Sequence, residues 1–267
     1  MSITTYPLPI TALFHCTVVT LNLRNQADRW LERRDLVVQQ LLETQPDLIS
    51  LQEISFPIGQ GRWLAHQLNL RLSGSMRRPY RLAQQRKRHL TKGYFEGIGI
   101  LSKLPIVSHD ALSLGYGGRV ALRVNVELPS RQTVDFVAVH LHHVTEDRQA
   151  RHEQVMKLLG WLNAGGRAPL QIIAGDFNET PGGPAVQQMK QAYRSALAEA
   201  NGRDPLATFP TALVARPDGW AGCLDYIFVS GPVHVLSARL CCHRPAAHDD
   251  TLYPSDHVGL LAALGME

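Results

Sequence analysis

The sequence predicts an α/β protein with mixed sheets, and two patterns along the chain carry this prediction. In the amino-terminal part a strand, a helix and a strand follow one another, the order of a parallel pair joined by a right-handed crossover. In the middle of the chain several strands follow one another without helices, which favours an antiparallel half. No linker-like composition divides the 267 residues, so we expect one domain over 1–267.

The first unit covers residues 14–53. Residues 14–23 form a buried-strand run that ends at Asn22, and residues 47–51 form a second strand that delivers Glu53 just beyond its end. Parallel strands end at the same sheet edge, so Asn22 and Glu53 should emerge together, where ligands bind in open α/β sheets. Between them, residues 30–44 fit an amphipathic helix. We expect Trp30, Val37, Val38 and Leu41 to form its apolar stripe, with Arg33, Arg34, Gln39 and Gln40 opposite.

The other elements follow from the same periodicities and from the turn residues between them. We expect helices at 62–69 and 146–164, a loop and helix at 181–200, and strands at 95–102, 106–114, 120–128, 133–141, 170–174, 224–229, 233–241 and 258–264.

The stretch from Ile172 to Pro181 is the strongest candidate for chemistry. A buried strand stops there at Gly175, which we expect to let the backbone turn sharply. Asp176 and Asn178, two residues apart, can then project to one side. The carboxylate suits metal binding or water activation, and the amide can donate to an oxyanion. An ordinary Asx-turn would use the same residues.

Further polar residues stand at predicted strand ends. Glu53 suits a hard cation such as Mg²⁺. Alternation places His140 and His142 on one face, and we favour a phosphate contact for His140 over a zinc cluster, with structural roles for His142 and His143. An aspartate such as Asp225 could fix the tautomer of His257, while Asp256 should point toward a metal. The expected site set is Asn22, Glu53, His140, Asp176, Asn178, Asp225, Asp256 and His257.

Charge is unevenly distributed along the chain. No acidic residue lies between Glu53 and Glu96, whereas nine basic residues do, although the whole chain carries only +4. We expect a basic loop from Arg77 to Lys92 that attracts a polyanion, either nucleic acid or an anionic membrane, although such a run can also be simply solvated. The expected substrate-binding residues are Arg77, Arg78, Arg86, Lys87 and Arg88, together with Trp220 in a Pro- and Gly-rich loop.

The cysteines and the apolar runs indicate the environment. Four cysteines without CxxC spacing are typical of reduced thiols in a cytoplasmic protein. Neighbouring strand residues point to opposite faces, so the pair Cys241 and Cys242 should be structural rather than metal-binding. No apolar run is long enough to span a bilayer, and the amino terminus makes a poor signal peptide. We expect no transmembrane segment and assume a monomer.

The ordered motifs together resemble the endonuclease/exonuclease/phosphatase superfamily over nearly the whole chain. The motifs are LNLR (21–24), PDLISLQE (46–53), GIGILSKLPI (97–106), VHLHH (139–143), AGDFNETP (174–181), LDYIFVS (224–230) and SDHVGLLA (255–262). This resemblance implies a four-layer α/β sandwich, with two mixed sheets packed face to face and flanked by helices. It also implies Mg²⁺- or Mn²⁺-dependent cleavage of phosphoester bonds at one rim.

The resemblance also assigns roles residue by residue. Glu53 becomes the metal ligand, assisted by Asn22 and Asp256, while Asp176 and Asn178 orient or activate water. His257, held by Asp225, acts as general base or stabilises phosphate oxygens. His140 contacts the scissile phosphate, as a general acid paired with Glu96 in DNase I-like members.

One departure narrows the substrate. Exonuclease III-type apurinic endonucleases have asparagine where His140 stands, so an abasic-site repair enzyme is disfavoured. TFPT at 208–211 resembles the deadenylase-like branch loosely. A nuclease acting on DNA or RNA is the leading hypothesis. A phosphodiesterase or phosphatase for phosphoinositides, sphingomyelin or other small phosphoesters is second, and an inactive binding module is third.

Overall fold

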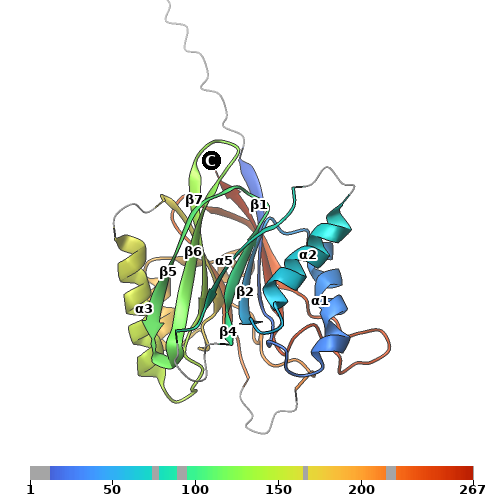
Figure 1. The fold of residues 1–267 in the computed structure, drawn as a ribbon. Coiled ribbons are helices and arrows are strands. Elements are labelled where there is room, and N and C mark those ends of the chain that lie inside the picture. Colours follow the sequence, from blue (N-terminus) through green and yellow to red (C-terminus); the bar gives the residue numbers. More distant parts are fainter. Residues whose placement is uncertain (1–12, 74–77, 89–94, 165–167, 215–220, 267) are drawn as a thin grey trace, which may run out of the picture.

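Two six-stranded sheets lie face to face with helices on their outer sides (Figure 1). The computed structural model describes residues 13–73, 78–88, 95–164, 168–214 and 221–266. One sheet has the order β11-β12-β1-β2-β4-β3 and the other the order β5-β6-β7-β8-β10-β9. The predicted sandwich of two mixed sheets is therefore confirmed.

The first sheet and its helices are built mainly from the amino-terminal part and the carboxyl end of the chain. Its strands are β1 (Phe14–Asn22), β2 (Leu48–Ser55), β3 (Arg81–Arg86), β4 (Glu96–Ser102), β11 (His234–Cys241) and β12 (Gly259–Met266). Its outer face carries α1 (Trp30–Thr44) and α2 (Gln60–Leu72).

The second sheet is built from the middle of the chain. Its strands are β5 (Ile106–Gly115), β6 (Arg119–Glu127), β7 (Thr133–His140), β8 (Leu170–Asp176), β9 (Arg194–Ser195) and β10 (Asp225–Val229). The helices are α3 (Arg148–Asn163), α4 (Pro184–Lys190) and α5 (Ala196–Asn201), and a 3₁₀ turn covers Tyr116–Gly118. Within the described residues no helix is long and apolar enough to cross a membrane.

Three apolar clusters hold the layers together. The largest lies between the sheets and combines residues of both, such as Val18, Ile100, Phe136 and Ile172. A second cluster packs α1 and α2 onto the first sheet, and a third packs α3 and α4 onto the second. Burial of these aliphatic side chains from water is the main favourable term for such an architecture.

Within the described part of the chain each sheet contains one parallel pair, near its middle. Strands β1 and β2 are parallel and joined through α1, while β7 and β8 are parallel and joined through α3. We call these the first and second βαβ units. The predicted parallel pair of the first unit and the predicted antiparallel pair β6–β7 are both confirmed.

Several local predictions were wrong. Gly175 does not turn the chain; it lies inside β8, which runs on to Asp176. A Cβ at Gly175 would stand 2.0 Å from the carbonyl oxygen of Val139, so this position requires glycine for a close approach of strands. Glu53 does not follow β2 but lies within it, where the register to β4 shifts between Leu51 and Ile54.

The polar side of α1 was also misplaced. The stripe residues Trp30, Val37, Val38 and Leu41 are buried as predicted, but so are Arg33 and Gln40. Gln40 donates to the Arg244 carbonyl, so a loop covers this side of the helix.

Cys241 and Cys242 were predicted to point to opposite faces of a strand, and this part of their prediction is wrong. Cys242 has a left-handed φ of 49°, so the two side chains do not alternate, and both join the cluster beneath α1. The thiol of Cys241 hydrogen-bonds that of Cys242, and this contact together with burial raises its pKa.

Candidate active site

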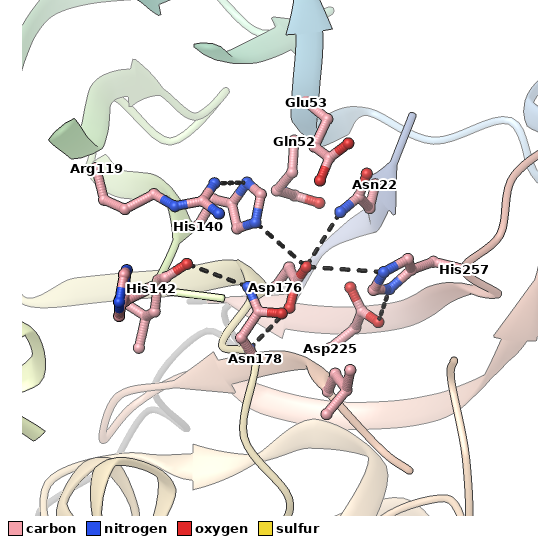
Figure 2. A network of polar contacts seen from close by, with 12 residues as sticks. Asn22, Gln52, Glu53, Arg119, His140, His142, Asp176, Asn178, Asp225 and His257 are labelled. Carbon is pink, nitrogen blue, oxygen red and sulfur yellow. Dashed lines mark hydrogen bonds and ion pairs between the residues drawn. The ribbon is translucent and has the colours of Figure 1, made fainter. Parts of the chain in front are cut away.

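The two βαβ units bring their carboxyl ends together at one rim. Asn22 ends β1, and His140 and Asp176 end β7 and β8, where they stand opposite each other in register. The Asn22 amide Nδ2 donates to Asp176 Oδ2 across the gap between the sheets at 3.1 Å. Residues more than 150 positions apart in sequence thus meet in one buried cluster (Figure 2).

Asp176 is the centre of this cluster. Its Oδ1 accepts from the backbone N–H of Asn178 at 2.8 Å. Its Oδ2 faces Asn22 and also two imidazoles, His140 Nε2 at 3.5 Å and His257 Nε2 at 3.8 Å (Figure 2). Burial raises the pKa of Asp176 to about 7, with Asp225 adding to the rise and His257 opposing it. A carboxylate with such a pKa can take up a proton near neutral pH.

His257 and Asp225 form the predicted contact. His257 Nδ1 lies 2.8 Å from Asp225 Oδ2, which also accepts from the Thr208 hydroxyl at 2.6 Å. Burial alone would lower the pKa of His257, but Asp225 and Asp176 outweigh it and raise the pKa to about 10. The carboxylates thus favour the protonated ring, whose Nδ1–H donates to Asp225. Thr208 belongs to the TFPT stretch but was not predicted as a site residue.

His140 has a different partner from the expected one. Its Nδ1 lies 2.6 Å from Nη1 of Arg119, the first residue of β6 (Figure 2). Glu96 Oε1 is 3.9 Å from the same nitrogen. Burial, then Arg119 and Lys87, hold the pKa of His140 well below its usual range. Arg119 was not predicted as a site residue, and its one visible signal is an arginine at the start of a strand whose next three residues are apolar. His142, predicted to share the face of His140, follows the end of β7 and instead pairs with Asp147.

Glu53 lies in a second acidic group on the other side of the cluster. Glu53, Glu96 and His140 each place a ligand atom within 4.8 Å of the others, as do Asp176, Asp225 and His257. Burial raises the pKa of Glu53, and the neighbouring carboxylates of Glu96 and Asp256 raise it further. Lys87 and Arg119 partly balance this charge by pairing with Glu96.

This acidic group fits a hard divalent cation. Carboxylate oxygens are the ligands that Mg²⁺ and Mn²⁺ prefer. A bound cation would also offset the repulsion between these crowded negative charges. Among the residues that the structure describes, Asn25 alone donates to Glu53 Oε2, at 3.3 Å, which leaves this oxygen available. The Asn22 Oδ1 accepts from the Arg24 N–H, and Asp256 Oδ2 pairs with Arg24 at 3.3 Å, so these two would share their oxygens with existing partners.

Two buried arginines, both missed from the sequence, hold the loops that carry the site. Arg33 of α1 donates to six backbone carbonyls, those of Leu23, Arg24, Asn25, Ala27, Asp28 and Pro254. Arg151 of α3 donates to the carbonyls of His142, Val144 and Thr145 and to the Glu179 carboxylate. These bonds fix the chain just after Asn22 and just after His140.

Asn178 also has a defined environment. Its side-chain Nδ2 donates to the Leu141 carbonyl at 3.1 Å, and its φ is 50°. One amide hydrogen is thereby used to tie the ends of β7 and β8 together. The predicted donation to an oxyanion has to come from the second amide hydrogen.

The predicted basic loop is not one loop. Residues 81–86 form β3, an edge strand that runs antiparallel to β4, with Arg81 opposite Ser102 and Arg86 opposite Gly97. Arg86, Lys87 and Arg88 therefore lie at the rim beside Glu96. Arg78 lines a pocket with Phe14, Asp47 and Pro129 at the other end of the strands, away from the Asp176 cluster, and its contact with substrate stays a prediction. Arg77 and Trp220 lie outside the described residues.

The fold and the cluster together define a class of protein, a two-sheet sandwich with an acidic and histidine-rich site at one rim. The family model described as "Endonuclease/Exonuclease/phosphatase family" matches residues 19–257. The chain belongs to this family, whose members are phosphoester hydrolases, and the resemblance inferred from the motifs is confirmed.

Solved structures agree with the fold. An endonuclease/exonuclease/phosphatase protein from Bacteroides vulgatus aligns with a TM-score of 0.74 at 18% identity, covering 95% of this chain and all of the other. The human Nocturnin catalytic domain with bound sulfate gives 0.71 at 20%, with 94% of each chain covered. Truncated Caenorhabditis elegans TDP2 gives 0.73 at 20%, covering 94% and 98%. No curated protein matches the sequence.

Proposed function

We propose that the protein is a divalent-cation-dependent phosphodiester hydrolase that cleaves DNA or RNA. The observation that carries this proposal is the buried Asp176 carboxylate, which faces two histidines and lies across the cluster from the acidic group around Glu53. Such a cluster combines a proton acceptor, fixed N–H donors and a place for a cation. These are the parts that in-line attack on a phosphodiester requires.

The residues divide the work as follows. Asp176, oriented by Asn178 and Asn22, takes the proton of the attacking water. His257 is held by Asp225 and donates to a phosphate oxygen, and His140 donates to another. Glu53, with Asp256 and Asn22, would hold Mg²⁺ or Mn²⁺. When bound, that cation would polarise the phosphate and offset its developing charge.

A nucleic acid is the favoured substrate because a row of basic side chains extends from the site along the rim. Arg86, Lys87 and Arg88 follow one another there, and Lys87 is already paired at the edge of the acidic group. The human Nocturnin catalytic domain, which shares the fold, is known with a bound sulfate, a tetrahedral dianion. The same rim would also attract a phosphoinositide headgroup, which is the second candidate.

We also propose a cytoplasmic location. All four cysteines are buried free thiols, which suits a reducing compartment. A cell fractionation experiment would test this, and finding the protein in the membrane pellet would contradict it.

Turnover with Mg²⁺ or Mn²⁺ tests the function, with EDTA as the control. The substrates are supercoiled plasmid, single-stranded DNA, structured RNA, a phosphoinositide and sphingomyelin. We expect cleavage of a polynucleotide that EDTA and Asp176→Asn both abolish. Release from a lipid alone would replace the nuclease by the second candidate, and metal-independent activity would contradict the proposal.

A further inference from the structure

His140 meets a partner that can only donate hydrogen bonds. The ring and the Arg119 guanidinium are both almost completely buried, with 1% and 3% of their surfaces exposed. Arg119 Nη1 lies 2.6 Å from Nδ1 of the ring (Figure 2). Arginine has five N–H donors and no acceptor, so Nδ1 must contribute a lone pair. The ring hydrogen is then on Nε2, the nitrogen that faces Asp176.

Glu96 could impose the opposite arrangement if it were the direct partner. A carboxylate accepts, so a bond from Glu96 to Nδ1 would require a hydrogen on Nδ1. The two arrangements exclude each other, and the distances separate them, since Glu96 Oε1 is 3.9 Å from Nδ1. Glu96 instead lies 3.6 Å from Arg119 Nη1 and pairs with Lys87. It can therefore act on His140 only through Arg119.

We propose that Arg119 is a positioning residue that holds His140 in the Nε2–H tautomer, and that Glu96 contacts Arg119 rather than His140. This rests on the proposed function, in which His140 Nε2–H donates to a phosphate oxygen. The partner of the second ring nitrogen commonly fixes tautomer and ring orientation in proteins. Here that partner is Arg119, which donates a hydrogen bond to Nδ1, whereas a carboxylate would accept one. His140 therefore binds phosphate as a neutral ring that donates from Nε2.

The consequence for the reaction is specific. An imidazolium carries hydrogens on both nitrogens, which would set an N–H against the N–H of Arg119. His140 therefore does not carry a second proton for a leaving group. It keeps its one hydrogen at Nε2, 3.5 Å from Asp176 Oδ2.

Nitrogen-15 NMR tests the tautomer without any substrate. The full chain is labelled at its 12 histidines and measured at neutral pH with Mg²⁺, and His140→Gln identifies the signal of His140. We expect an unprotonated Nδ1 and a protonated Nε2 in the wild type. Arg119→Met should lose this pattern, while Arg131→Met, in the exposed turn of the same hairpin, should keep it. A protonated Nδ1 in the wild type, or an unchanged pattern in Arg119→Met, would overturn the proposal.

Glu96→Gln provides a second variant in case Arg119→Met does not fold. Glu96 is partly exposed, and its 3.6 Å contact with Arg119 is much longer than the 2.6 Å contact of Arg119 with His140, so we expect Arg119 to stay beside His140 in Glu96→Gln. We expect the wild-type tautomer in Glu96→Gln, whereas direct pairing of Glu96 with His140 predicts a changed tautomer and would overturn the proposal. Where a substrate is turned over, Arg119→Met should lower kcat by about 10–100-fold, as for other residues that orient a functional histidine. The expected tautomer in a protein without phosphodiesterase activity would refute the function and leave this inference standing.

Discussion

The two βαβ units are built alike but stabilise their site loops differently. In each unit the fourth residue of the helix is a buried arginine, Arg33 in α1 and Arg151 in α3. Each guanidinium donates to carbonyls of the loop that follows the unit's first strand. Arg151 also pairs with the buried Glu179 carboxylate at 3.3 Å, whereas the hydrogen-bond partners of Arg33 are all backbone carbonyls.

This difference matches a difference in the chemistry of the units. The first unit places Glu53 beside the further carboxylates Glu96 and Asp256 and is therefore rich in negative charge. The second unit places its one central carboxylate, Asp176, between two histidines. We infer that the first unit holds the cation and the second handles the proton. Each loop is fixed by a buried arginine, and in the second unit the Glu179 carboxylate compensates the charge of that arginine.

The largest expected effect concerns the two carboxylates. Glu53→Gln and Asp176→Asn should each lower kcat by about 10³–10⁴-fold, because each removes a group that acts on the reacting atoms. Glu53→Gln should also raise the Mn²⁺ concentration needed for half-maximal activity, and Asp176→Asn should not. Turnover measured over a Mn²⁺ titration checks this. Equal shifts of the Mn²⁺ midpoint in both variants would contradict the division of labour.

The buried arginines should differ in how their loss can be repaired. Arg151→Met leaves Glu179 buried without its cation and should lower the free energy of unfolding by about 3–5 kcal/mol. Adding Glu179→Gln should restore part of that loss. Arg33→Met leaves several carbonyls unpaired, at a cost of about 1–3 kcal/mol for each that water cannot reach, and has no bonded carboxylate whose removal could help.

Urea unfolding of these variants measures the difference. Arg131→Met, in an exposed turn, serves as the control and should change little. If adding Glu179→Gln to Arg151→Met restored none of the free energy of unfolding, Glu179 would not compensate the charge of Arg151.

His140 gives the second unit a pH dependence. Its folded pKa is lowered, so below about pH 6.5 the unfolded chain binds a proton that the folded chain does not. Stability from His140 is therefore present above pH 6.5 and is lost as the pH falls below it. His140→Gln should remove up to about 1.4 kcal/mol per pH unit of this slope. Denaturation in EDTA at pH 5.0, 5.5 and 6.0 measures it, and parallel curves for both proteins would refute it.

The smallest effect concerns the basic residues at the two ends of β3. The carboxyl end of this strand lies at the site rim, and its amino end lies at the other end of the first sheet. Arg86→Ala with Arg88→Ala should reduce the slope of log affinity against log salt by about 2, one for each lost phosphate contact. Arg78→Ala with Arg81→Ala removes the same charge at the remote end and should leave the slope unchanged. Binding of single-stranded DNA to the Asp176→Asn variant at several salt concentrations measures both. Equal slopes in the two double variants would mean that the rim is not the binding face.

Much of the fold could be predicted from the sequence because buried strands leave apolar runs and turns leave Gly and Pro. The site residues at strand ends followed from the same pattern, together with the ordered motifs. The arginines could not be predicted in this way. Arg33 stands in sequence like any residue on the polar side of a helix, and its burial arises from loops that come from distant parts of the chain, including Pro254. Likewise, nothing local to Glu53 indicates the register shift that places it inside β2.

The conformation of Glu53 has a consequence for how this family member could change over time. With φ at 53°, its backbone adopts a shape that costs an L-residue about 1 kcal/mol or more and costs glycine almost nothing. Glu53→Gly would relieve that strain and also remove a crowded carboxylate, so loss of catalysis would coincide with a gain in stability. Activity at this position is therefore held at the expense of stability, and a single substitution to glycine would separate the two.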